Sequence, residues 1–141
     1  MILKSFELTK IKLNNYKFYL FYGDNEGLKE ENIKNLFEKS YQDKIHRYEE
    51  KEILDNINIF FNSILIKSFF DNEKLIIINR ATDKIRTVLE DLMEKDPEDI
   101  KIILNSKNLE KKSSLRKLFE KEKSIVCVPF YEDNNQTLNS I

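Results

Sequence analysis

The residues closest to a chemical motif are the glycines of the stretch YGDNEGLKEEN, at positions 22–32. Gly23 and Gly27 are the only glycines in the chain. They follow an apolar run and precede charged residues with helical spacing, which is how a phosphate-binding loop begins. The chemistry that this pattern raises is the binding of a nucleotide phosphate at the start of a helix.

The details of the loop argue against that chemistry. A working loop reads G-x-x-x-x-G-K-[ST], in which amides surround phosphate, the lysine reaches the outer phosphates and the hydroxyl ligates magnesium. Here three residues separate the glycines, Lys29 comes one position late, and Glu30 replaces the hydroxyl residue. The dinucleotide pattern G-x-G-x-x-G is also absent. Four acidic residues crowd the place of a polyanion: Asp24, Glu26, Glu30 and Glu31. We therefore predict a degenerate phosphate loop, a tight turn that keeps the geometry without the nucleotide.

Other reactive residue types are too few or too scattered for catalysis. Cys127 is the only cysteine and lies in the apolar run SIVCVPF, which predicts a buried strand residue. His46 is the only histidine, so the chain offers neither a Cys–His pair nor a histidine-rich metal site. Turn acids and the lysine-rich stretch at 105–123 are typical of solvated surfaces. We predict no catalytic residues, no metal and no cofactor.

Composition limits the class of protein. The chain has 141 residues, a formal charge of -1 and 35% charged residues, which predict about one domain with a surface of mixed sign. No apolar run approaches the roughly 20 residues that span a bilayer, and the N-terminus lacks the pattern of a signal peptide. We expect a cytoplasmic protein without a membrane partner.

Apolar patterns predict alternating strands and helices. Continuous apolar runs predict strands, and apolar residues at helical spacing predict the helices between them. Expected strands lie at 17–22, 44–48, 74–79, 99–105 and 124–130, and expected helices at 2–14, 26–39, 49–66, 82–93 and 111–123. Thr82 and Asp83 are expected helix caps, and Ser113 and Ser114 an expected helix start. This alternation predicts an α/β fold with a parallel five-stranded sheet covered by helices on both faces.

One feature does not fit the core pattern. Phe69 and Phe70 come at the end of the predicted helix 49–66, directly before the acidic turn 71–73. An exposed pair of aromatic side chains at a helix end is typical of an anchor for a protein partner. The same pair could equally belong to the core, and the pattern leaves both interpretations open.

The chain resembles the N-terminal domain of the delta subunit of the bacterial DNA polymerase III clamp loader. The resemblance rests on four stretches that occur in the family's order over nearly all of the chain: FYLFYGDNEGLKEE, SFFDNEKLIIINR, KIILNSKNLEKKSSLRKLFE and VCVPFYEDNNQTLNSI. It implies an AAA+/P-loop-like three-layer domain with a broken phosphate loop that does not bind ATP. It also implies a domain at 1–131 and, at 132–141, the start of a connection to a further domain.

The resemblance also implies a binding site. In that family a Ser-Leu-Phe segment before the central strand inserts into a hydrophobic pocket of the beta sliding clamp, and the matching residues here are Ser68, Phe69 and Phe70. Leu65 and Ile66, in the helix leading in, would belong to the surrounding contact surface. Two departures stand out: Phe69 replaces the usual leucine and demands a roomier pocket, and Leu65 and Ile66 stand where clamp-binding motifs often have glutamine.

The function that this resemblance implies is non-enzymatic. The domain would bind the beta sliding clamp and help to open it for loading onto DNA during replication, as a non-catalytic subunit of the DNA polymerase III holoenzyme. Other clamp-loader subunits would be contacted through further domains, and DNA only indirectly. Two alternatives remain: a nucleotide-binding ATPase-type domain, which the missing Lys-Ser/Thr pair opposes, and a generic α/β adaptor with the phenylalanine pair in its core.

Overall fold

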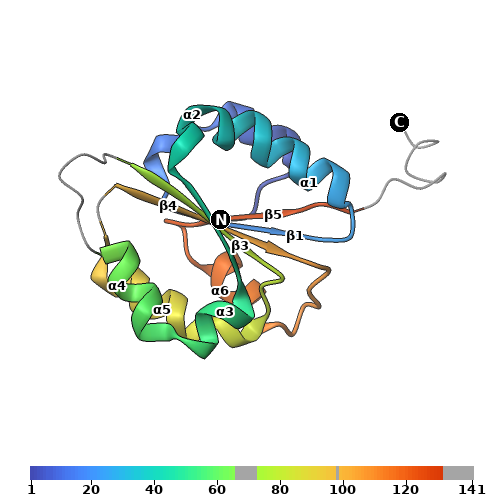
Figure 1. Ribbon diagram of the computed structural model, residues 1–141. Helices are drawn as coiled ribbons and strands as arrows, with labels where there is room; N and C mark the ends of the chain where they lie inside the picture. The colour runs from blue at the N-terminus through green and yellow to red at the C-terminus, as the bar shows by residue number, and fades with distance from the viewer. Residues whose placement is uncertain (66–72, 98, 132–141) are drawn as a thin grey trace, which may run out of the picture.

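The computed structural model describes residues 1–65, 73–97 and 99–131, and within them a single parallel sheet forms the centre (Figure 1). Five strands are described in this sheet, in the order β2-β3-β4-β1-β5. They are β1 (Phe18–Tyr22), β2 (Ile45–Glu49), β3 (Lys74–Asn79), β4 (Ile100–Ser106) and β5 (Val126–Pro129). The predicted α/β class and the parallel five-stranded sheet are confirmed.

Strands β1, β3 and β4 are apolar because the sheet is covered on both sides. Every residue of β1 is buried, as are the four central residues of β3. Side chains alternate between two cores, so neighbours along one strand pack against different helices. The predicted core residues are confirmed as buried, each exposing 2% or less of its surface: Ile76, Ile78, Ile102 and Val126.

Helices form a layer on each face of the sheet (Figure 1). One layer contains α1 (Glu26–Ile33), a π-helical turn at Lys34–Glu38 and α2 (Lys39–Tyr41). The other contains α3 (Glu50–Asp55), α4 (Ile57–Leu65), α5 (Arg86–Lys95) and α6 (Ser114–Lys121). Among the described residues, 3-10 helices lie at Ser5–Lys10, Leu13–Asn15, Gln42–Lys44 and Asp83–Ile85. The three-layer arrangement is the one that the alternating pattern predicted.

The prediction of a helix at 2–14 is wrong. The chain there is extended at Ile2, which bridges to Cys127, and a 3-10 helix follows at Ser5–Lys10. The cause is pairing with β5: the Leu3 amide donates to the Cys127 carbonyl at 2.9 Å, and the Cys127 amide donates to the Met1 carbonyl at 2.8 Å. Backbone groups that complete a sheet edge are not available to a helix.

The helix predicted at 49–66 is divided in two. Asn56, with φ -145° and ψ 62°, separates α3 from α4. Its amide donates to the Ile53 carbonyl, and its own carbonyl accepts from the Phe60 amide at 3.1 Å, so it ends one helix and begins the next. Residue 66 lies outside the described residues. Helix α4 is therefore a separate helix, and its Phe60 and Ile64 side chains are buried.

Helix caps fall where the sequence predicted them. The Thr82 hydroxyl accepts from the Lys84 amide at 3.3 Å, and the Ser113 hydroxyl accepts from the Arg116 amide at 3.2 Å. Asp83 joins the two sites, because its Oδ1 accepts from the Ser113 hydroxyl at 2.5 Å and from the Leu115 amide at 3.0 Å. The beginnings of α5 and α6 are therefore fixed to each other.

Candidate functional site

The glycine loop lies at the carboxyl end of β1, where ligands bind in many parallel sheets. Gly23 has a φ of +124°, and a Cβ atom added to it would lie 2.1 Å from the Phe130 carbonyl oxygen. Only glycine fits this turn without strain. Gly27 differs, since it lies inside α1 and a Cβ atom there would meet only Asn25 Oδ1, at 4.0 Å, which is an ordinary contact. The first glycine is therefore required by the fold, and the second is not.

The loop's backbone donors are largely committed within the protein. Gly23 donates to the Lys107 carbonyl at 3.3 Å, and Asn25 donates to the Phe130 carbonyl at 3.0 Å. The Leu28 amide is capped by Asn25 Oδ1 at 3.1 Å. A phosphate loop works by aiming free amides at the ligand. In this loop the Gly23 and Asn25 amides instead hold the turn against the residues that directly follow β4 and β5.

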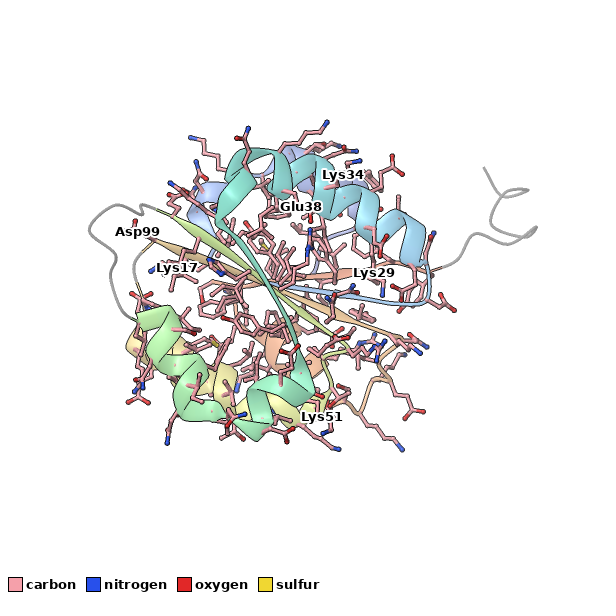
Figure 2. The ribbon with its side chains drawn as sticks, in the orientation of Figure 1. Lys17, Lys29, Lys34, Glu38, Lys51 and Asp99 are labelled. Atoms are coloured by element: carbon pink, nitrogen blue, oxygen red, sulfur yellow. The ribbon has the colours of Figure 1, made fainter. Side chains whose placement is uncertain are left out.

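Lys29 is the lysine that stands nearest to a phosphate-loop position. It extends from α1 toward the sheet and is fully buried (Figure 2). Its Nζ donates to the Ser106 carbonyl at 2.7 Å and to Glu26 Oε1 at 2.8 Å. The ammonium therefore attaches α1 to the end of β4 and neutralises a loop carboxylate. The sequence alone did not predict this role, although a glutamate three residues before a lysine on a helix is a signal for such a pair.

Cys127 and His46 lie on β5 and β2, the strands at the two ends of the described sheet order, so they do not form a pair. Cys127 is buried in β5, and burial raises the pKa of its thiol to about 12. A thiol that stays protonated near neutral pH is a poor nucleophile. His46 lies exposed in β2. Within the described ranges, no three histidine, cysteine or acidic side chains are grouped so that they could hold a metal ion.

The predicted clamp-binding residues precede β3 in the sequence. Ile66, Ser68, Phe69 and Phe70 fall outside the described residues, so the structure does not test their placement. Leu65 is described: it ends α4 with 37% of its surface exposed. Ile59 on the same helix exposes 66%, while Ile64 is buried. Helix α4 is therefore held by one face and presents apolar side chains on another.

The residues that follow segment 66–72 are also held in place. The Lys74 amide donates to the Asp99 carbonyl at 2.8 Å. Glu73 hydrogen-bonds the Tyr41 hydroxyl, and burial with this contact raises the pKa of Tyr41 above its usual range. Lys101 lies in the same pocket, and its burial lowers its pKa, an effect that Glu73 opposes. The segment therefore starts from a packed helix and ends at a fixed strand.

The described residues contain no helix with the length and apolar character that crossing a membrane requires.

Of the acids predicted to be solvated in turns, Asp96 pairs with Lys17 at 2.7 Å on the surface. Asp71 and Glu98 lie outside the described residues. These observations leave two places of interest: the carboxyl edge with its degenerate loop, and the neighbourhood of segment 66–72.

Comparison with known proteins identifies the family. The model of the family described as DNA polymerase III, delta subunit, matches residues 19–128. Among solved structures, the DNA clamp loader delta protein (YqeN) of Bacillus subtilis has a TM-score of 0.68 at 15% identity, over 95% of this chain. The match spans 43% of that protein's length. No curated protein matches the chain in sequence. Because the family model covers most of the sheet and its helices, the chain belongs to the delta subunit family of DNA polymerase III.

Proposed function

We propose that this chain is the clamp-binding domain of a clamp-loader delta subunit. The observation that carries the proposal is the family match over residues 19–128, which begins in β1, ends in β5 and includes the predicted contact segment. The fold likeness to a protein named a clamp loader delta protein supports the same function. The domain would extend over 1–131, with 132–141 leading to a further domain.

The proposed contact is a pair of phenylalanine rings on a segment with fixed ends. Ser68, Phe69 and Phe70 would insert into an apolar pocket of the beta sliding clamp, with Leu65 and Ile66 beside them. The exposed surface of Leu65 and the buried packing of Ile64 agree with such a role for the end of α4. Fixed flanks reduce the entropy lost on binding. Burying each ring would contribute on the order of 1.5–3 kcal/mol.

A double variant tests the contact. We expect Phe69→Ala combined with Phe70→Ala to weaken binding to the clamp from the same organism by about a hundredfold or more, since 1.4 kcal/mol is about tenfold. Surface plasmon resonance measures the affinity, and circular dichroism melting measures the stability of the same variant.

Phe6→Ala is the matched control. Phe6 exposes 61% of its surface and belongs to the 3-10 helix Ser5–Lys10, whose buried Leu8 packs with Ile33 and Phe37, so its loss removes an exposed ring that is not part of the predicted contact. Its clamp affinity should equal that of the unchanged chain. Full binding by the double variant would contradict the proposal, and a collapsed melt would favour a core role for the pair.

The proposed role needs no catalysis by this chain. Binding energy would favour a distorted, open clamp, which is then placed on DNA. Other clamp-loader subunits would be contacted through further domains, and DNA would be reached through the clamp. The protein would act as a non-catalytic part of the DNA polymerase III holoenzyme.

The degenerate loop gives a second test of this proposal. Lys29 is bonded to Ser106 and Glu26, and the loop amides are bonded to β4 and β5, so a nucleotide phosphate would meet carboxylates. We expect no binding of ATP with magnesium at millimolar concentration by isothermal titration calorimetry. A saturable site with micromolar affinity would contradict this and revive the ATPase interpretation.

A further inference from the structure

An open pocket of 720 Å³ lies where β4 begins, with walls from the N-terminal segment and from α2. The half-buried apolar side chains of Ile11, Leu13 and Leu36 line it together with the polar groups of Tyr41 and Lys101. Pockets of roughly 300–1,000 Å³ with apolar walls and a few convergent polar groups are typical of small-molecule sites. The volume therefore suits a small organic molecule.

Lys101 is a charged residue within the apolar part of β4, which reads IKIILNS. It exposes only 8% of its surface. Because side chains alternate along a strand, it lies on the same face of the sheet as Ile103, which belongs to one core cluster with Phe37 and Tyr41. Lysine side chains are rarely buried to this degree unless their charge is paired. The ammonium group at this position therefore requires acceptors.

The described residues meet only part of this requirement. Among them, the Lys101 ammonium group donates to Asn14 Oδ1 at 3.2 Å, whereas an ammonium group has three N–H donors. Glu73 lines the same pocket, but its carboxylate accepts the Tyr41 hydroxyl and its side chain is exposed to water. Donors of a nearly buried cation are therefore left for an acceptor inside the pocket.

The charges of the walls select the acceptor. Of the described residues, two lysines, Lys12 and Lys101, and one acid, Glu73, line the pocket, so its net charge is positive. A phosphate monoester carries up to two negative charges near Glu73, so a singly charged anion fits better. Carboxylates form short, charge-assisted hydrogen bonds with ammonium groups. We propose that this pocket binds a small carboxylate carrying a short apolar group, with Lys101 Nζ as the donor to the carboxylate.

The apolar group of the ligand would lie against the aliphatic walls. Leu36, in one of these walls, belongs to the π-helical turn Lys34–Glu38. Such single turns are frequent at functional sites. The site goes beyond clamp binding and does not depend on it, because its donor comes from β4 and its walls from the N-terminal segment and the π-helical turn. A failed clamp experiment would leave this proposal in place.

The test is a titration of the isotope-labelled chain, followed by the NMR shifts of its backbone amides. The probe is 4-methylpentanoate, and the matched probes are neutral 4-methylpentanamide and acetate, which lacks the apolar group. We expect saturable shifts at Asn14, Tyr41 and Lys101 with the first probe, and at least tenfold weaker binding of the other two.

A carboxylate of this kind could be a free acid or the carboxyl terminus of a polypeptide. N-acetyl-leucine carries the same group as the end of a polypeptide does. Tighter binding of N-acetyl-leucine than of 4-methylpentanoate would assign the site to a polypeptide terminus, and the reverse order would assign it to a free acid.

Two variants locate the site. Lys101→Met keeps the length of the side chain and should weaken the binding of 4-methylpentanoate at least tenfold. It should melt at or above the temperature of the unchanged chain, because it removes an incompletely paired buried charge. Glu73→Gln keeps an acceptor for the Tyr41 hydroxyl and removes the opposing charge, so it should bind the probe at least twofold more tightly.

Lys112→Met is the matched control. It removes an exposed lysine that is paired with Glu110 and does not line the pocket, so the affinity should stay unchanged. Equal binding of the amide probe, full affinity of Lys101→Met, or no saturable shifts would overturn the proposal. Weaker binding by Glu73→Gln would overturn it as well, and this variant decides the matter if Lys101→Met fails to fold.

Discussion

At the scale of single residues, the position of one backbone oxygen determines what Gly23 must be. The Phe130 carbonyl lies where a Cβ atom would stand, and it cannot withdraw because it accepts the Asn25 amide at 3.0 Å. The glycine thus allows β1 and β5 to approach at the start of the loop. A sequence motif that suggests phosphate binding is explained here by chain packing.

The two glycines should respond in opposite ways to alanine. Gly23→Ala places a methyl group against the backbone at a φ of +124°, so we expect a loss of stability on the order of 1–3 kcal/mol or more. Gly27→Ala adds a methyl group within a helix, with only an ordinary contact to Asn25 Oδ1, and should raise the stability by roughly 0.5–1 kcal/mol. Urea unfolding followed by circular dichroism measures both. Equal effects of the two changes would show that the turn at Gly23 is not the one described.

At the scale of elements, strands were easier to predict than helix boundaries. The run KLIIIN coincides with β3 because burial on both faces leaves an uninterrupted apolar signal. The helix predicted at 2–14 failed because pairing of Ile2 and Leu3 with β5 is a long-range contact that local spacing does not encode. The break at Asn56 was missed for a related reason, since the apolar spacing continues across it.

The candidate sites were predictable to different degrees. The missing lysine and hydroxyl of the loop are visible in the sequence, so the degenerate loop could be argued from residue types alone. The roles of Lys29 and Ser106 could not, because α1 and β4 lie 77 positions apart where the two meet. Leu65 and its neighbours came only from resemblance to a family, and their contact remains a prediction.

The junction between α5 and α6 should depend on pH through Asp83. A hydrogen bond from the Ser113 hydroxyl lowers the pKa of this carboxyl group, with further help from the Leu115 amide. A folded-state pKa below the unfolded value stabilises the fold above the unfolded pKa of about 4, and that stabilisation is lost as the pH falls through the folded value.

Asp83→Asn isolates this contribution. The variant keeps the shape of the side chain and cannot ionise, so we expect a lower melting temperature than that of the unchanged chain at pH 7. The difference should shrink as the pH falls below about 4, where the carboxyl group of the unchanged chain also becomes neutral. Melting curves of both proteins from pH 7 to pH 3 measure it. A constant difference over this range would mean that Asp83 acts by shape and not by charge.

At the scale of the whole molecule, the degenerate loop and the predicted clamp contact belong to different ends of the strands. The carboxyl ends of the strands lie beside the degenerate loop, and segment 66–72 precedes β3 in the sequence. The β3 and β4 strands are mostly buried, and Lys74–Asn79 pairs with Ile100–Asn105 without a break, which makes the sheet a rigid support. A rigid support suits a domain that must hold a distorted partner, because little of the binding energy is lost in its own deformation.

The proposed opening of the clamp has a thermodynamic consequence that can be measured. A protein shifts a partner toward one conformation only by the difference between its affinities for the two conformations. If this chain favours the open ring, it must bind a clamp whose subunit interface has been weakened by mutation more tightly than the closed ring. A weakened interface lowers the free energy that the chain must supply to open the clamp. Each 1.4 kcal/mol of that reduction should lower Kd about tenfold.

We therefore expect a lower Kd for the interface-weakened clamp, measured by surface plasmon resonance with the chain immobilised. The variant carrying Phe69→Ala and Phe70→Ala should lose affinity for both clamps by a similar factor. The phenylalanine side chains provide the contact with either clamp, whereas the difference between the two Kd values comes from the free energy of opening the clamp. Equal Kd values for the two clamps would mean that the chain attaches to the clamp without favouring its opening. In that case the opening would have to come from other parts of the clamp loader, while the contact itself would stand.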